Sequence, residues 1–121
     1  MINRASDGAA DSTEMRKEWL SYSPMATTTI AVLTEIPAGV ESGWHTHPGE
    51  EVGYILAGTV RMMIAGKPTL TLQAGDPFLM PPGQPHNALD LGPETGRMLS
   101  TYIVDPDQPL ATLTGGDQPG P

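Results

Sequence analysis

The chain has 121 residues, a length typical of one domain, and its 14 acidic and 6 basic residues give a formal net charge of −8 at pH 7. So acidic a chain lacks the basic surface that binds DNA, RNA or anionic membranes, and we expect no nucleic-acid or membrane partner. The absence of cysteine excludes disulfides, thiolate metal sites and cysteine nucleophiles, and 14 Gly with 13 Pro disfavour a helix bundle.

The chain divides into three predicted zones. Residues 1–14 are small and polar and predict a flexible leader, followed by a short helical candidate at 14–20. Residues 15–105 are expected to form a single domain, and residues 106–121 a Pro/Gly-rich tail. No apolar run approaches the roughly 20 residues of a membrane-spanning helix, and no apolar signal segment opens the chain. We therefore expect a cytoplasmic protein.

The central zone is expected to consist of short strands. β-Branched and apolar runs alternate with Gly/Pro turn signals, and the predicted strands cover residues 28–36, 51–56, 60–64, 70–72, 78–80 and 97–104. Turn signals every 8–12 residues predict an all-β fold, as a small β-barrel or jelly roll. Closure into a barrel removes exposed strand edges and leaves an interior that can hold one small ligand.

The three histidines of the chain fall in a pattern that can bind a metal. His45 and His47 are two residues apart, so on a strand both imidazoles project from one face. Glu51 follows across a Pro-Gly turn, and His86 comes directly after a Pro-rich turn that opens another strand. A His-x-His pair also occurs as ordinary surface or hydrogen-bonded residues, so the pair alone leaves metal binding open.

Two longer motifs make the chain resemble the cupins. The spacing Gly, five residues, His-x-His, three residues, Glu, six residues, Gly fits 39–58 throughout. The second motif fits at Gly75, Pro81, Gly83 and His86, although Asp90 replaces its final Asn. The resemblance implies the cupin double-stranded β-helix, in a small single-domain protein of the quercetin-dioxygenase-like type. It also implies a homodimer.

The resemblance further implies one metal site per chain. Its ligands would be His45, His47, Glu51 and His86, holding one divalent transition metal among Fe, Mn, Ni, Cu and Zn. Glu50 is the rival carboxylate, but the cupin spacing and the period-2 alternation of the strand favour Glu51.

Such a site predicts a metal-dependent enzyme acting on a small molecule. We expect an oxidoreductase of the dioxygenase class, iron being one suitable metal. The alternatives are a non-oxidative isomerase, cyclase, decarboxylase or lyase, and a non-catalytic small-molecule-binding protein. Within the predicted strands of the barrel and their turns, which begin at residue 28, the only cations are Arg61, Lys67 and Arg97, because Arg4, Arg16 and Lys17 precede them. Three cations are few for binding a polyanion, so a mostly neutral or enolic substrate is expected.

With all three histidines assigned to the metal, proton transfer would fall to another group. Glu51 is one candidate and Tyr102 another, with Tyr54 as an alternative to Tyr102. The remaining expected contacts of the substrate are apolar, and the predicted pocket-lining residues are Ile55, Met62, Phe78 and Met80.

Overall fold

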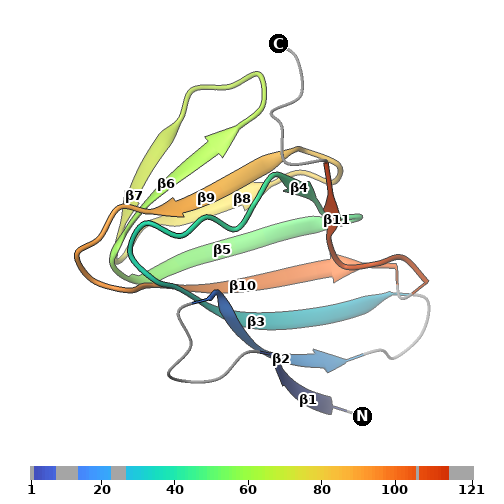
Figure 1. The fold of residues 1–121 in the computed structure, drawn as a ribbon. Helices are drawn as coiled ribbons and strands as arrows, with labels where there is room; N and C mark the ends of the chain where they lie inside the picture. The colour runs from blue at the N-terminus through green and yellow to red at the C-terminus, as the bar shows by residue number, and fades with distance from the viewer. Residues whose placement is uncertain (1, 8–13, 23–26, 106, 115–121) are drawn as a thin grey trace.

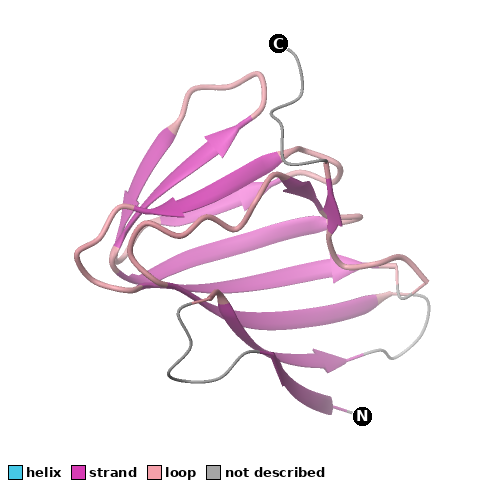
Figure 2. Ribbon diagram, viewed as in Figure 1, coloured by secondary structure: helices cyan, strands magenta, loops and turns pink. Residues whose placement is uncertain are grey.

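The computed structural model describes residues 2–7, 14–22, 27–105 and 107–114. Within these ranges every regular element is a β-strand, and no helix is present that could span a membrane (Figure 2). The strands are β1 (Ile2–Asp7), β2 (Arg16–Tyr22), β3 (Thr28–Ile36), β4 (His45–Thr46), β5 (Glu50–Ala57), β6 (Thr59–Ile64), β7 (Leu70–Gln73), β8 (Pro77–Met80), β9 (His86–Asp90), β10 (Gly96–Val104) and β11 (Thr112–Leu113).

The strands form two antiparallel sheets that face each other. The larger has the order β1-β2-β3-β10-β5-β8, and the smaller has the order β11-β4-β9-β6-β7. In Figure 1, β4 and β11 lie at one end of the space between the sheets. This architecture confirms the predicted all-β barrel of the double-stranded β-helix type.

Alternation along the long strands β5 and β10 separates a buried inner face from a more exposed outer face. On β5 the residues Glu51, Gly53 and Ile55 are buried, whereas Val52 and Tyr54 are exposed. β10 alternates in the same way over its nine residues. The inner faces of both sheets supply the larger of two buried clusters, whose members are Ile36, Ile55, Val60, Met62, Ile64, Leu72, Phe78, Met80, Ala88 and Met98.

The helix predicted at 14–20 is wrong, because Arg16–Tyr22 form strand β2. The strand pairs with β1 on one side and β3 on the other, and this pairing places Lys17 opposite Thr34. Residues 2–7 of the predicted leader form β1. The rest of that leader, at residue 1 and residues 8–13, lies outside the described residues.

The predicted tail is partly described, and its described part lies against the barrel. Leu110 packs on the buried cluster of Val32, Tyr102 and Val104, and β11 pairs with β4 through Thr112 and Thr46. Residues 106 and 115–121 lie outside the described residues. The segment 107–114 therefore helps to form the end of the barrel where the histidines lie.

Candidate metal centre

The fold brings the three histidines together from two strands of the smaller sheet. His45 on β4 is the cross-strand partner of His86 on β9, and His47 follows β4 by one residue. Ring centroids are 4.3 Å apart for His45 and His86, and 4.8 and 5.0 Å for the pairs that include His47. One ring nitrogen from each residue lies within 4.8 Å of those of the other two.

Backbone carbonyls fix the orientation of all three imidazoles. Nδ1 lies 2.6 Å from Gly43 O in His45, 2.8 Å from Leu110 O in His47 and 2.8 Å from Gln84 O in His86. A carbonyl oxygen only accepts hydrogen bonds, so each Nδ1 carries the proton. Each Nε2 then keeps a free lone pair, which is the state of a metal-ligating histidine.

Glu51 enters the same cluster from β5 of the opposite sheet. Its side chain is buried, and Oε1 lies 3.3 Å from Nε2 of both His47 and His86. Its other oxygen, Oε2, accepts hydrogen bonds from Ser100 Oγ at 2.7 Å and Tyr102 OH at 3.0 Å. The adjacent Glu50 is exposed on the outer face of β5.

The surroundings of the cluster keep the Glu51 carboxylate charged and the His45 imidazole neutral. Burial raises the pKa of Glu51, whereas His47 and His86, when they also carry a proton on Nε2, and the Ser100 hydroxyl bring this pKa below its usual range. Burial, reinforced by the charge that neighbouring His86 carries when it is protonated, lowers the pKa of His45 from 6.5 to about 4. Burial and the neighbouring Glu51 carboxylate raise the pKa of Tyr102.

These residues fit a divalent cation. With the protons on Nδ1, the lone pairs of His47 and His86 face the carboxylate oxygen of Glu51, an arrangement that repels unless a positive charge lies between them. His47 Nε2 and Glu51 Oε1 are both buried without a hydrogen-bond partner. Three imidazoles and one carboxylate suit Fe, Mn, Ni, Cu and Zn alike, so the donor set does not select one metal.

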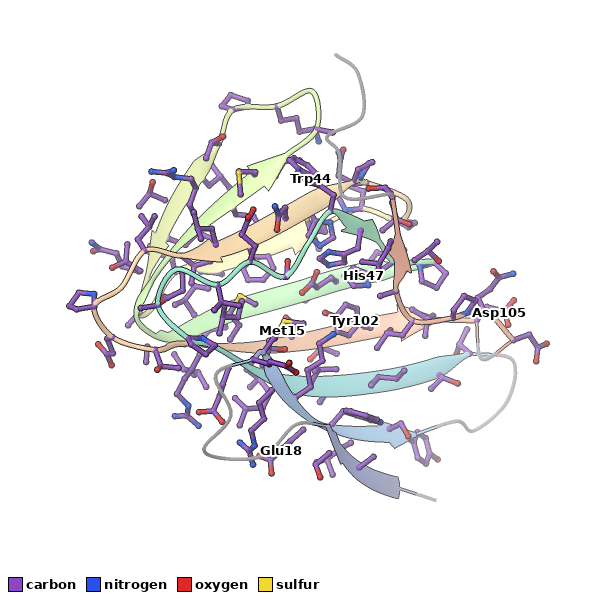
Figure 3. All side chains as sticks on the ribbon, in the orientation of Figure 1. Met15, Glu18, Trp44, His47, Tyr102 and Asp105 are labelled. Carbon is purple, nitrogen blue, oxygen red and sulfur yellow. The ribbon has the colours of Figure 1, made fainter. Side chains whose placement is uncertain are left out.

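A cavity of about 130 Å³ adjoins the cluster. His45, His86, Glu51 and Tyr102 reach it, and the rest of its wall is mainly apolar; these other lining residues are Met15, Lys17, Thr34, Ser42, Met62, Ala88, Met98, Ala111 and Leu113. Figure 3 shows His47 and Tyr102 between the two sheets, and their rings are 4.5 Å apart.

The structure divides the predicted pocket residues into two groups. Met62 lines this cavity, but Ile55, Phe78 and Met80 do not; they belong to the apolar core. The ring of Phe78 lies directly over Gly53, where a Cβ would come within 2.0 Å of it. Tyr54, the alternative to Tyr102, is exposed on the outer face of β5, away from the site.

Sequence reasoning missed Lys17, the one cationic side chain that lines the cavity in the described part of the chain. None of the described carboxylates forms an ion pair with it. The signal that could have found it is the alternation of side chains along a strand. Because residues 16–22 form strand β2, Lys17 and Trp19 lie on the face that points to the interior of the barrel, whereas Glu18 lies on the outer face.

Asn87, next to His86, was also missed. Its Oδ1 accepts a hydrogen bond from Gly43 N at 2.9 Å, and its Nδ2 donates to Glu41 Oε1 at 2.6 Å. Gly43 is the residue whose carbonyl holds the His45 ring. Asn87 therefore ties the segment before β4 to β9, and so supports the position of His45.

Comparison with known proteins gives matches at both sequence and structure level. Residues 32–102 match the family described as Cupin domain. The dimethylsulfoniopropionate lyase DddQ of Ruegeria pomeroyi is 38% identical over 64 residues, which is 52% of this chain and 32% of the relative. Its crystal structure superposes with a TM-score of 0.67 at 29% identity, covering 74% of this chain and 44% of that one.

Two further solved structures share the fold at lower identity. A cupin from Shewanella frigidimarina gives a TM-score of 0.67 at 22% identity, covering 84% of this chain and 86% of that one. Oxalate decarboxylase from Bacillus subtilis, described with Mn(II) centres, gives 0.73 at 20% identity over 87% of this chain and 29% of that one. The chain thus spans about a third of the length of the curated relative that it matches.

Proposed function

The chain belongs to the cupin family, and from this premise we propose that it is a metal-dependent lyase acting on a small organic acid. The observation that carries the proposal is the arrangement of three imidazoles, each with its Nε2 lone pair free, around the buried Glu51 carboxylate at the wall of a small cavity. The similarity to a dimethylsulfoniopropionate lyase supports the reaction class.

The metal ligands we propose are His45, His47, Glu51 and His86. A divalent transition cation bound there would act as a Lewis acid that stabilises negative charge developing on the substrate. Glu51 uses only one oxygen for this purpose, because Ser100 and Tyr102 hold the other. We therefore assign Glu51 to metal binding and not to direct abstraction of a proton from the substrate.

Lys17 is the proposed partner of the substrate carboxylate. It is the cation of the cavity wall, and its ammonium has no ion pair with a described carboxylate. A charge-assisted hydrogen bond from lysine is stronger than one between neutral groups, so it would orient an acid in the cavity. This substrate class differs from the neutral or enolic molecule expected from the sequence.

Tyr102 is the proposed proton-transfer residue. It lines the cavity, and its hydroxyl donates to Glu51 Oε2, which directs its oxygen lone pairs away from the carboxylate. In the elimination we propose, a proton leaves the carbon next to the substrate carboxylate for the Tyr102 oxygen, while the Tyr102 hydroxyl passes its own proton to Glu51 Oε2, so that the tyrosine stays neutral. The electrons of that C–H bond form a C=C bond as the leaving group departs with its own bonding pair.

The size and polarity of the cavity support a small substrate. A cavity of about 130 Å³ is close to the roughly 150 Å³ that accommodates benzene. Met62, Met98 and Leu113 supply apolar surface around it, against which the carbon skeleton of a short acid can pack.

The test is turnover without oxygen. Protein reconstituted with each candidate metal is incubated anaerobically with dimethylsulfoniopropionate and other short acids that carry a β leaving group, and the unsaturated acid is followed by NMR. We expect Lys17→Met to raise KM about tenfold or more with kcat nearly unchanged, from the loss of one charge-assisted contact. The matched control is Lys67→Met, in an exposed turn. An unaltered KM in Lys17→Met would contradict the assigned role.

Dioxygenase chemistry is the second candidate function. The observation that allows it is the donor set itself, because three imidazoles and one carboxylate suit the redox-active metals Fe, Mn, Ni and Cu as well as Zn. An oxygen electrode distinguishes the two: turnover that stops when oxygen is removed would replace the lyase proposal. Tight binding of a short acid with no product from any metal form would identify a binding protein.

A further inference from the structure

Thr34 is a buried polar residue of the cavity wall that takes no part in the hydrogen bonds of the metal centre. It lies on the inner face of β3, is 4% exposed, and lines the cavity. The two other hydroxyls of this wall are engaged, because Tyr102 donates to Glu51 Oε2 and Ser42 Oγ accepts from a backbone N–H. None of the hydrogen bonds between described residues uses the Thr34 hydroxyl. Buried hydroxyls nearly always have a partner, so this one is available to a ligand in the cavity.

Strand pairing places Lys17 beside this hydroxyl. β2 and β3 are neighbours in the larger sheet (Figure 1), and Lys17 is the cross-strand partner of Thr34. Side chains directly opposite each other on an antiparallel pair begin about 5 Å apart, and both of these side chains line the cavity. Lys17 has no ion pair with a described carboxylate. An ammonium group and a hydroxyl, both free to donate hydrogen bonds, therefore lie together on the wall.

A carboxylate is the acceptor that suits both donors. Each of its two oxygens accepts hydrogen bonds, and a hydrogen bond to a charged group is about twice as strong as one between neutral groups. A neutral carbonyl compound offers one oxygen and leaves the second donor of the pair without an acceptor, which weakens binding in a buried site. The two donors together therefore favour an acid over a neutral carbonyl compound of the same size.

The two donors lie a short distance from the proposed proton-transfer residue. Thr34 is opposite Met98 on β10, and Ser100 is the next inward residue of that strand, about 7 Å further along it. The hydroxyls of Ser100 and Tyr102 meet at Oε2 of Glu51, to which both donate. A short acid held by its carboxylate at Thr34 therefore has the carbon beside that carboxylate directed towards the Tyr102 hydroxyl.

We infer that Lys17 and Thr34 form one carboxylate-binding subsite, in which Lys17 donates to one oxygen and Thr34 to the other. The inference rests on the proposed function, which gives the substrate carboxylate to Lys17, and it adds Thr34 as a specificity-determining residue. Lys17 supplies the charge, whereas Thr34 supplies a directed hydrogen bond from a buried position. The subsite thus selects an acid by its second oxygen as well as by its charge.

The test compares the binding of an acid with that of its neutral counterpart, without turnover. Propionate and butanone have nearly the same shape, but in butanone a methyl group replaces one carboxylate oxygen. Isothermal titration measures the binding of each to the zinc-loaded wild type and to Thr34→Val, in which valine keeps the shape of threonine and lacks the hydroxyl. We expect Thr34→Val to weaken propionate binding by about tenfold or more, because a hydrogen bond to a charged group is lost, and to leave butanone binding unchanged.

Further variants separate the lost hydroxyl from a disturbed fold. Thr34→Ser keeps the hydroxyl and should bind propionate nearly as the wild type does, whereas Thr34→Ala, which lacks it, should repeat the loss. Thr29→Val is the matched control, since Thr29 is exposed on the outer face of the same strand. Equal propionate affinity in the wild type and Thr34→Val overturns the inference, because the carboxylate would then bind elsewhere, such as on the metal. An equal loss for propionate and butanone also overturns it, because that result would reveal a change in the shape of the cavity.

Failure of the subsite and failure of the lyase assignment give different results. Propionate carries no leaving group, so its binding is measured whether or not the protein catalyses an elimination. A wild type that binds propionate more tightly than Thr34→Val does, yet turns over no acid, keeps the subsite and loses the lyase assignment. A wild type that turns over an acid, with KM and propionate affinity unchanged in Thr34→Val, keeps the lyase assignment and overturns the subsite. A wild type that binds propionate no more tightly than butanone overturns the subsite as well.

Discussion

The substitution Glu51→Gln tests the metal centre by predicting opposite effects with and without metal. Glutamine keeps the shape of the side chain but replaces one carboxylate oxygen by an NH₂ group. In the metal-free protein this NH₂ can donate to Nε2 of His47 and His86, which lie 3.3 Å from Glu51 Oε1. The remaining oxygen can still accept from Ser100 and Tyr102.

The expected change in the free energy of unfolding follows from two buried atoms that lack hydrogen bonds. His47 Nε2 and Glu51 Oε1 are buried without hydrogen bonds, and such a group costs about 1–3 kcal/mol. Against this gain, the hydrogen bonds from Ser100 and Tyr102 lose a charged acceptor, at about 1 kcal/mol each. We expect the metal-free variant to be as stable as the wild type or more stable by about 1 kcal/mol. Its metal affinity should fall at least about 100-fold, since even outer partners of a metal ligand are worth about 10–100-fold.

The assay is urea unfolding in chelator and again with an excess of the preferred metal. A wild-type chain at a hundredfold excess of metal over Kd gains about 2.7 kcal/mol, and the variant should gain almost none. Glu50→Gln is the control, because that carboxylate is exposed and should change neither measurement. Destabilisation of the metal-free variant by about 3–5 kcal/mol would refute the reasoning, since it would reveal a broken ion pair with protonated imidazoles.

Two further predictions concern the supports of the site. In the metal-free protein the free energy of unfolding should fall as the pH drops from 6.5 towards 4, because His45 takes up a proton in the unfolded chain before it does so in the folded protein. The expected loss is about 3 kcal/mol at most. Urea unfolding followed by circular dichroism at a series of pH values measures this loss, and a free energy that does not change with pH would contradict the prediction. Asn87→Ala removes the contacts of Asn87 with Gly43 N and Glu41, so it should cost about 1–3 kcal/mol and weaken metal binding about tenfold. Isothermal titration measures the second effect, and an unchanged affinity in a destabilised variant would separate this contact from the position of His45.

The sequence predicts that the four proposed ligands lie close together, because strand alternation and motif spacing decide which side chains share a face. Period-2 alternation puts His45 and His47 on one face, and the same rule selects Glu51 over Glu50. The cupin motif then brings His86 to the group. The structure adds what spacing cannot give, namely the carbonyl that orients each ring and the hydroxyls of Ser100 and Tyr102 on Glu51.

Lys17 could not be found in the same way, because its strand exists through pairing with distant segments. Seven residues of mixed polarity from Arg16 to Tyr22 fit a short helix or a strand, and only their pairing with β1 and β3 decides. Alternation also shows which residues face inward but not how far they lie along the barrel. Ile55 is four residues beyond Glu51, about 13 Å along β5, so it reaches the filled part of the core.

The hydrogen bond between His47 Nδ1 and Leu110 O couples the affinity for metal to the docking of the segment 107–114 on the barrel. If that segment fixes the protonated nitrogen of His47 and thereby strengthens metal binding, the metal must strengthen the docking of the segment by the same free energy. The part of the chain that follows the last long strand is therefore an energetic component of the site. Amide hydrogen exchange at residues 107–114 should therefore be slower when metal occupies the site than when the site is empty.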